Sequence, residues 1–425
     1  MKTALGFLVA ARRCEIRDLE QLTLTCELVK IVSELVHCFQ RERGTSNIFL
    51  GSGGHNVAAQ RQACIAASVS VEAQWRAWID PLALDGVCGS GGVRLFTHIA
   101  LVLHGLDELP KLRADIQALQ CSTGHATKLY NRLIAALLGL VFEAADIATD
   151  PTVSRLLVAL FNLMQAKEYA GQERAAGAAA FALGKITPEE VQALQALIDL
   201  QEQCFQRFET FSAPESLQQW QALQSRQPLV ELERMRRKLM AGLPTGQRDG
   251  TLAQSWFDCC SLRMDQVHLV ESHLATSLQQ VCAHRISASQ AELEDHRVLL
   301  AALDSLSEIT APPVVLMPGD CLAAAPDTLL TGDGMGPRVM RSIFDSLQIQ
   351  SQKLQAVSEE LAVVRGALEE RKVIERAKGL LMAHQGLSEE EAYRLLRQTA
   401  MGKNRRIIDV ARAALSMVEL LPVRS

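Results

Sequence analysis

Two stretches of the sequence each place a Glu-Arg pair directly before small residues. The first is QRERGTS at residues 40–46, and the second is KEYAGQERAAG at residues 167–177. Both stretches lie in segments whose apolar residues recur every three or four positions, the spacing of one helical face. Small residues let two helix backbones approach closely. Arg43 and Arg174 could therefore face a shared cleft between equivalent helices of an internal repeat.

Two arginines in one cleft could bind a planar oxyanion. A guanidinium is planar and offers parallel donors, so it matches such an anion better than lysine does. Glu42 and Glu173 could pair with other basic groups and hold the two arginines in place. Arg236 is a third candidate, with Arg234 and Arg237 as close competitors. The alternative is a set of solvated or structural salt bridges, which helical Glu-Arg pairs usually form.

A second candidate surface lies at the C-terminus. From Arg371 to Ser425 the chain carries 11 Lys and Arg against 6 Asp and Glu, a net charge of +5, whereas the remainder carries −10. A basic tail on an acidic body suggests that the tail alone meets a polyanion. The scarcity of aromatic residues favours phosphate and shape recognition over base stacking; the alternative is a solvated basic surface. The candidate residues are Arg376, Lys378, Arg397, Lys403, Arg405 and Arg406.

Sequence patterns of catalysis and metal binding are missing. No HExxH, GxSxG or P-loop motif occurs, and the 11 cysteines are scattered without a CxxC pair. We therefore expect no enzyme activity, no catalytic residues, no metal site and no cofactor. No apolar run reaches the roughly 18 residues that a membrane span needs, and Arg12 and Arg13 stand where a signal peptide would be cleaved. The expected location is the cytoplasm, without membrane association.

The same periodicity predicts an all-α fold. Aromatic residues make up only 4% of the chain, and no convincing alternating strand pattern appears. Thr187, Pro188 and Glu190 predict a helix start with a capping box. Long helices joined by short loops imply antiparallel bundles up to about Ser307. Residues 310–338 are rich in Pro and Gly and predict a flexible linker.

Beyond the linker, a heptad pattern predicts a coiled-coil helix over residues 339–372. The alternative is an amphipathic helix packed on its own body. Residues 373–425 predict three short helices, the first ending at Gln385 with Gly386 as its left-handed cap and the second starting with a capping box at Ser388. The heptad positions are Ile343, Leu347, Leu354, Val357, Leu361, Val364 and Leu368.

The C-terminal segment resembles an ANTAR domain. The resemblance rests on IERAKGLLM at residues 374–382 and on matching residues from Gly386 to Ala411. It implies a three-helix module that follows a coiled coil, binds paired hairpin loops in nascent RNA and prevents a terminator from forming. The boundary implied for this RNA-binding domain is 373–425.

The body resembles the NIT family of helical nitrate- and nitrite-sensing domains. The resemblance rests on the two Glu-Arg stretches, on the Met235-Arg236-Arg237 segment and on Trp256. It covers about residues 20–285 of a predicted sensor domain over residues 20–307. It implies two packed antiparallel four-helix bundles, with nitrate held between equivalent helices. It assigns nitrate-binding roles to Arg43, Arg174 and Arg236.

The combination resembles nitrate-responsive transcription antitermination regulators of nitrate assimilation operons. It implies that nitrate or nitrite is an effector ligand, whose binding releases or reorients the ANTAR unit. The partners expected from it are hairpins of leader RNA and the transcription elongation complex. The heptads allow a second copy of the chain as a further partner, in a homodimer, but they also allow a helix that packs on its own sensor. The alternatives from other classes are a nitrate-sensing DNA-binding transcription factor and a signalling adaptor.

Overall fold

A computed structural model describes residues 4–81, 92–224, 227–242, 250–306, 337–387, 389–403 and 405–419. Every regular element in these ranges is an α-helix, so the predicted all-α fold is confirmed. The predicted linker at 310–338 lies outside the described residues except for its last two positions, which begin a helix. The helices are α1 (Ala4–Gly51), α2 (Ala58–Ile79), α3 (Gly92–Gln117), α4 (Thr123–Ile147), α5 (Pro151–Leu183), α6 (Pro188–Phe211), α7 (Pro214–Gln224), α8 (Gln227–Met240), α9 (Gly250–Leu306), α10 (Pro337–Gln385), α11 (Glu389–Gly402) and α12 (Ile407–Glu419).

The helices form two compact units. The smaller unit comprises Met1–Leu24 and Gln280–Ala362, which contribute the start of α1, the end of α9 and most of α10. Within it, the carboxylate of Glu292 pairs with Lys353 Nζ at 3.0 Å and also with Arg12. One carboxylate therefore links all three helices of this unit.

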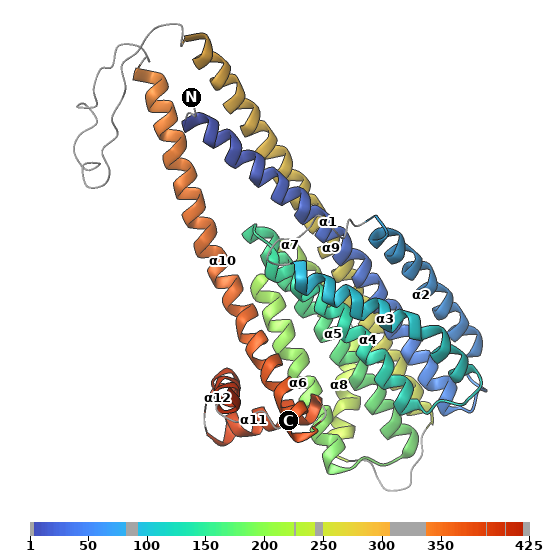
Figure 1. The fold of residues 1–425 in the computed structure, drawn as a ribbon. Helices are drawn as coiled ribbons and strands as arrows, with labels where there is room; N and C mark the ends of the chain where they lie inside the picture. The colour runs from blue at the N-terminus through green and yellow to red at the C-terminus, as the bar shows by residue number, and fades with distance from the viewer. Residues whose placement is uncertain are drawn as a thin grey trace. The chain divides into compact units, whose positions relative to one another are not determined.

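The larger unit comprises Thr25–Gln279 and Val363–Ser425. In it α3 packs on α4, α4 on α5, and α5 on α6 (Figure 1). Helices α1 to α4 share a buried polar cluster around Glu42. Helices α5, α6, α8 and α9 share an apolar core around Trp256. These two groups of four helices correspond to the two predicted bundles, and both positively charged candidate sites belong to this unit.

Two predicted helix ends are present. The hydroxyl of Thr187 accepts a bond from the backbone N–H of Glu190 at 3.2 Å, and the Glu190 carboxylate accepts one from the Thr187 N–H at 2.8 Å. Gly386 follows α10 with a φ of +67°, a conformation that side chains with a Cβ rarely adopt. The second predicted capping residue, Ser388, lies outside the described residues.

The C-terminal module combines the last turns of α10 with α11 and α12. The predicted coiled-coil helix and the first predicted helix of this module are one continuous helix, α10. Of the heptad positions, Leu361, Val364 and Leu368 are buried within the single chain, whereas Leu354 is 61% exposed. Burial at these three positions confirms the amphipathic heptad pattern, on which both the coiled coil and its alternative rest. The apolar core of the module consists of Ala377, Leu381, Ala392, Leu396, Ala400, Val410 and Ala411.

No helix within the described ranges is long and apolar enough to cross a membrane.

Candidate anion-binding site

Arg43 is buried inside the larger unit, on α1. Its side chain is 2% exposed. Its Nη1 donates to Glu168 Oε1 at 2.6 Å and its Nη2 to Glu168 Oε2 at 3.1 Å. Nη1 also donates to the side-chain oxygen of Asn131. The guanidinium thus bridges α1 to α5 and α4, and a carboxylate occupies its end-on fork.

Arg174 is equally buried, on α5, but its partners are neutral. Its Nη1 donates to Ser261 Oγ at 2.7 Å and its Nη2 to the backbone oxygen of Gln40 at 3.0 Å. The guanidinium carbon lies 4.6 Å from the centre of the Phe257 ring. Burial and the positive charge of Arg43 lower the pKa of Arg174 to about 10. In the described part of the chain, no carboxylate accepts a hydrogen bond from Arg174.

The two arginines approach each other's helices through glycine. A Cβ added at Gly44 would lie 2.5 Å from Arg174 Nη2, and a Cβ added at Gly171 would lie 2.5 Å from Arg43 Nη2. Side-chain atoms essentially never come that close to a Cβ. The small residues therefore make room for a guanidinium from the facing helix, as the internal repeat predicts, and the contact is reciprocal.

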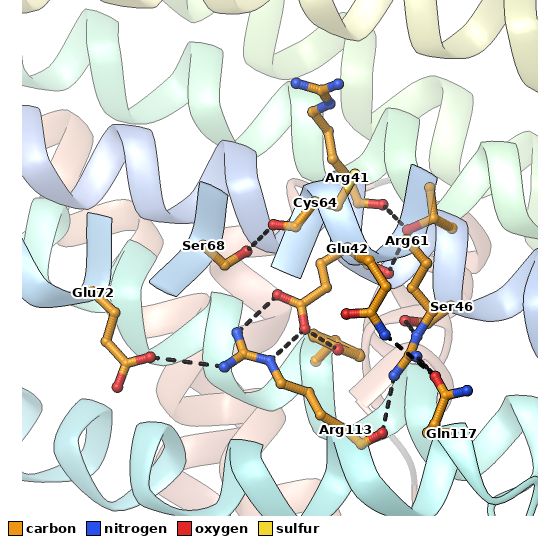
Figure 2. Close-up of polar contacts among 12 residues, drawn as sticks. Arg41, Glu42, Ser46, Arg61, Cys64, Ser68, Glu72, Arg113 and Gln117 are labelled. Carbon is orange, nitrogen blue, oxygen red and sulfur yellow. Dashed lines mark hydrogen bonds and ion pairs between the residues drawn. The ribbon is translucent and has the colours of Figure 1, made fainter. Parts of the chain in front are cut away.

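The glutamate before Arg43 is held by an arginine of another helix. Arg113 on α3 grips Glu42 with Nε at 2.7 Å and Nη2 at 2.9 Å, and the Tyr130 hydroxyl donates to the same carboxylate at 2.7 Å. Figure 2 shows this cluster, in which Arg61 donates to Ser46 and Gln117 while Arg41 points away from it. Glu42 therefore anchors the turn of α1 that carries Arg43.

The glutamate before Arg174 is held in the same way. Arg236 on α8 grips Glu173 through Nε and Nη2, both at 2.6 Å, and Gln201 Nε2 donates to Glu173 at 2.6 Å. Arg236 also donates to Glu233 at 2.6 Å. Burial alone would lower the pKa of Arg236, but the hydrogen bonds and charges of Glu173 and Glu233 raise it. Arg236 is thus the counterpart of Arg113, one in each group of four helices.

The three predicted arginines therefore do not have equal surroundings. Arg43 and Arg174 are brought together between α1 and α5, while Arg236 is 7% exposed and fully engaged with two glutamates. Its predicted competitor Arg234 is 59% exposed and pairs with Glu231 on its own helix. Of the neighbouring arginines, Arg236 is therefore the buried one, and it contacts Glu173, the residue directly before Arg174.

Several residues of the site carried no sequence motif. Arg113, Asn131 and Ser261 each supply a partner to one of the central side chains from a distant helix. Of these three, only Arg113 could have been inferred from the sequence. The internal repeat aligns Glu42 with Glu173, and because Arg236 pairs with Glu173, an equivalent arginine is expected to pair with Glu42.

A buried ionic network continues along α1, α5 and α9. Lys167 and Glu271, both fully buried, form an ion pair. The ring of His268 lies between Glu271 at 3.2 Å and Glu34 at 3.3 Å and stacks on the His37 ring at 3.8 Å. Burial and the positive charges of Lys167 and His268 lower the pKa of His37 to about 2. His37 is therefore held neutral at physiological pH.

Comparison with known families agrees with this geometry. Residues 34–279 match the family described as "Nitrate and nitrite sensing", the NIT family. The chain belongs to the NIT family. Residues 362–414 match the ANTAR domain family, so the NIT portion and the ANTAR domain occupy one chain.

Two relatives share nearly the whole length of this NIT–ANTAR protein. The nitrate regulatory protein of Klebsiella oxytoca is 33% identical over 410 residues, which cover 96% of this chain and 94% of that protein. The solved structure of the NasR transcription antiterminator is similar with a TM-score of 0.60 and 31% identity, over 98% of this chain and 99% of that one. Both alignments therefore span the NIT portion and the ANTAR domain of this chain.

The predicted basic residues of the ANTAR domain fall into two groups. Lys378 is 5% exposed and pairs with Glu375 of its own helix at 2.9 Å, and Arg397 pairs with Asp199 of α6. Arg406, though exposed, pairs with Glu370. Exposed members of the set are Arg376, Lys403, Arg405 and Arg406.

The ANTAR domain contacts the sensor through its own cations. Arg371 and Lys372 precede the predicted domain start at residue 373 but lie within the segment that matches the ANTAR family. Arg371 Nη2 donates to Gln165 Oε1 at 3.0 Å, and its guanidinium carbon lies 4.5 Å from the centre of the Phe161 ring. Lys372 Nζ pairs with Asp146 at 2.5 Å. These contacts, with that of Arg397, reach α4, α5 and α6.

A cleft of about 1880 Å³ separates the remaining surfaces of the sensor and the ANTAR domain. Arg371 and Arg397 line this cleft. Asn131 and Glu168, the two acceptors of Arg43, line it as well. The acceptors of Arg43 and the C-terminal module thus line the same cleft. In the described ranges, no three His, Cys, Asp or Glu side chains gather closely enough to hold a metal ion.

Proposed function

We propose that this protein is a nitrate-responsive transcription antitermination regulator, in which an anion bound between Arg43 and Arg174 controls the ANTAR domain. The observation that carries the sensor half is the environment of Arg174, a buried guanidinium whose described acceptors are neutral and which lies near a second guanidinium. Burying unneutralised charge is costly. An anion entering between the two arginines would relieve that cost. The relatives named for nitrate regulation and antitermination support the same function.

The proposed ligand is nitrate or nitrite, acting as an effector without any further cofactor. Arg43 and Arg174 would contact it directly through charge-assisted hydrogen bonds. Arg236 belongs to the proposed site as the residue that holds Glu173, and its bidentate contact favours positioning of Arg174 over direct contact with the anion.

The proposed output is binding of leader RNA hairpins. Arg371, Lys372 and Arg397 contact α4, α5 and α6 and so hold the ANTAR domain against the sensor. Because α5 carries both Arg174 and the acceptors of Arg371, a shift of α5 against α1 would release or reorient the domain. A coupling of about 1–3 kcal/mol would change RNA affinity roughly 5–150-fold. The proposed RNA-binding residues are Arg376, Lys378, Arg397, Lys403, Arg405 and Arg406.

We infer five further properties of the working protein. Its domains extend over 20–307, 339–372 and 373–425, joined by the linker at 310–338. It acts as a homodimer in the cytoplasm. It meets RNA as part of the transcription elongation complex, since antitermination acts on nascent RNA. It regulates without catalysing a reaction.

The test is binding of the full-length protein to a labelled two-hairpin leader RNA, with nitrate or with chloride at equal ionic strength. We expect RNA affinity to rise with nitrate only. Tight RNA binding that ignores nitrate would contradict the sensor assignment. Binding to palindromic duplex DNA in place of hairpin RNA would instead support the DNA-binding alternative.

The chain offers a matched pair of variants for the sensor. Arg43→Ala removes the buried guanidinium, whereas Arg41→Ala removes an exposed one two residues away that points elsewhere (Figure 2). We expect Arg43→Ala to abolish the nitrate response and Arg41→Ala to retain it. A nitrate response that survives in Arg43→Ala would remove Arg43 from the site.

A further inference from the structure

The carboxylate of Glu168 lies at the focus of four N–H donors. Arg43 donates twice, at 2.6 and 3.1 Å, Gln40 Nε2 donates to Oε2 at 2.9 Å, and Gln172 Nε2 donates to Oε1 at 3.0 Å. The side chain is only 5% exposed. Three residues from two helices are thus arranged around one planar, singly charged oxyanion, and that oxyanion belongs to the chain itself.

Nitrate has the shape and charge of this carboxylate group. Both are planar, and both accept two parallel bonds from the fork of a guanidinium. The remainder of Arg43 offers little room for a second such anion: Nη1 also donates to Asn131, and Nη2 lies against the backbone of Gly171, close enough to exclude even a Cβ. An anion that binds Arg43 through its end-on fork, formed by Nη1 and Nη2, must therefore take the place of Glu168.

Arg174 presents the opposite situation. Its described acceptors are the Ser261 hydroxyl and the Gln40 carbonyl, neither of which is charged. Gln40 connects the two arginines, because its backbone oxygen accepts from Arg174 while its side chain donates to Glu168. Among the residues that the structure describes, its buried Oε1 has no hydrogen-bond partner. Gln40 Nε2, which now donates to Glu168, is therefore placed to donate to an anion that takes the same position.

We propose that Glu168 is an internal competitor of nitrate, which occupies the fork of Arg43 in the empty sensor and thereby sets the nitrate concentration at which the sensor responds. This inference rests on the function proposed above and adds a residue that determines its threshold. Glu168 lines the cleft that faces the ANTAR domain, so the displaced carboxylate has space and cationic neighbours there, Arg371 among them.

The experiment is calorimetric titration of the full-length protein with nitrate at constant ionic strength, comparing wild type with Glu168→Gln. The variant keeps the size of the side chain but loses its charge and one acceptor. We expect nitrate to bind about 10- to 100-fold more tightly, because a competing set of charge-assisted hydrogen bonds is lost. The nitrate concentration for half-maximal RNA binding should fall by the same factor.

Asp265→Asn is the matched control. Asp265 lies 3.8 Å from the His37 ring, its charge acts on Arg174, and it contacts neither arginine fork in the described structure. We expect its nitrate affinity to stay within about twofold of wild type, since a half-exposed charge is well screened. Equal tightening in both variants would overturn the proposal, because a general change in the electrostatic field would then explain the effect.

Weaker or unchanged nitrate binding in Glu168→Gln would also overturn the proposal and make Glu168 a residue that positions Arg43. Damage to the fold weakens binding, so tightening cannot come from that source. If Glu168→Gln does not fold, Glu168→Asp keeps the charge but withdraws it by one methylene. It should tighten nitrate binding by a smaller factor, and unchanged affinity would overturn the proposal. Failure of the wild type itself to bind nitrate would instead refute the proposed function, and this inference with it.

Discussion

Substitution of Gly171 by alanine tests the reciprocal contact between α1 and α5. The new methyl group would lie 2.5 Å from Arg43 Nη2 and 3.2 Å from Met264 Cε. The guanidinium cannot move aside cheaply, because Glu168 and Asn131 hold it. Alanine in a helix interior is favoured over glycine by about 1 kcal/mol, whereas overpacking a buried site costs about 1–3 kcal/mol. The net free energy of unfolding should fall by roughly 0–2 kcal/mol.

Gly366→Ala provides the matched control. Gly366 also lies inside a helix, α10, but nothing within 4 Å would meet its added Cβ. Only the propensity gain applies there, so the variant should be more stable than wild type by up to about 1 kcal/mol. Urea unfolding followed by circular dichroism should therefore separate the two variants by about 1–3 kcal/mol.

Gly171→Ala and Gly366→Ala should also differ in nitrate affinity. Displacement of Arg43 removes charge-assisted hydrogen bonds to the anion, each of which contributes about 1.5–3 kcal/mol. Calorimetry should show nitrate affinity reduced at least tenfold in Gly171→Ala and unaltered in Gly366→Ala. If Gly171→Ala were as stable as Gly366→Ala and bound nitrate normally, the close approach of α5 to Arg43 would play no part in the site.

Three further predictions concern buried charge, pH and the domain contact. Arg236→Met should lower the free energy of unfolding by about 3–5 kcal/mol in urea titrations, because it leaves the buried Glu173 carboxylate without its arginine; a loss below 1 kcal/mol would contradict this pairing. His37→Asn should make the stability of the protein less sensitive to acid. The folded state keeps His37 neutral down to about pH 2, whereas the unfolded chain protonates it near pH 6.5. The free energy of unfolding of the wild type should therefore fall by up to about 1.4 kcal/mol per pH unit below 6.5, a slope that the variant should lack. Identical pH slopes from pH 5 to 6.5 in both proteins would be inconsistent with a neutral buried His37. Asp199→Asn should raise nitrate-free RNA affinity several-fold in filter binding, since Arg397 then loses its ion pair with the sensor; unchanged affinity would show that this contact does not restrain the ANTAR domain.

Local sequence determined the helices and marked the two central arginines. Apolar periodicity gave the all-α class, and Thr187 and Gly386 fixed helix ends through hydrogen bonds and backbone geometry that depend on neighbouring residues alone. The repeated Glu-Arg pairs before small residues located Arg43 and Arg174, because a close helix crossing needs glycine or alanine at that spacing. Such features are encoded within a few residues, so they are visible without a structure.

Only the tertiary structure determined which charged side chains pair with one another. Glu168 lies beside the second Glu-Arg stretch, yet nothing local indicates that its carboxylate occupies the fork of an arginine 125 positions earlier. The same holds for Arg113 on Glu42, and for Arg397, which the charge pattern placed on an RNA surface but which pairs with Asp199 of the sensor. Long charged side chains choose partners by the relative register and rotation of packed helices, and that register follows from the core as a whole.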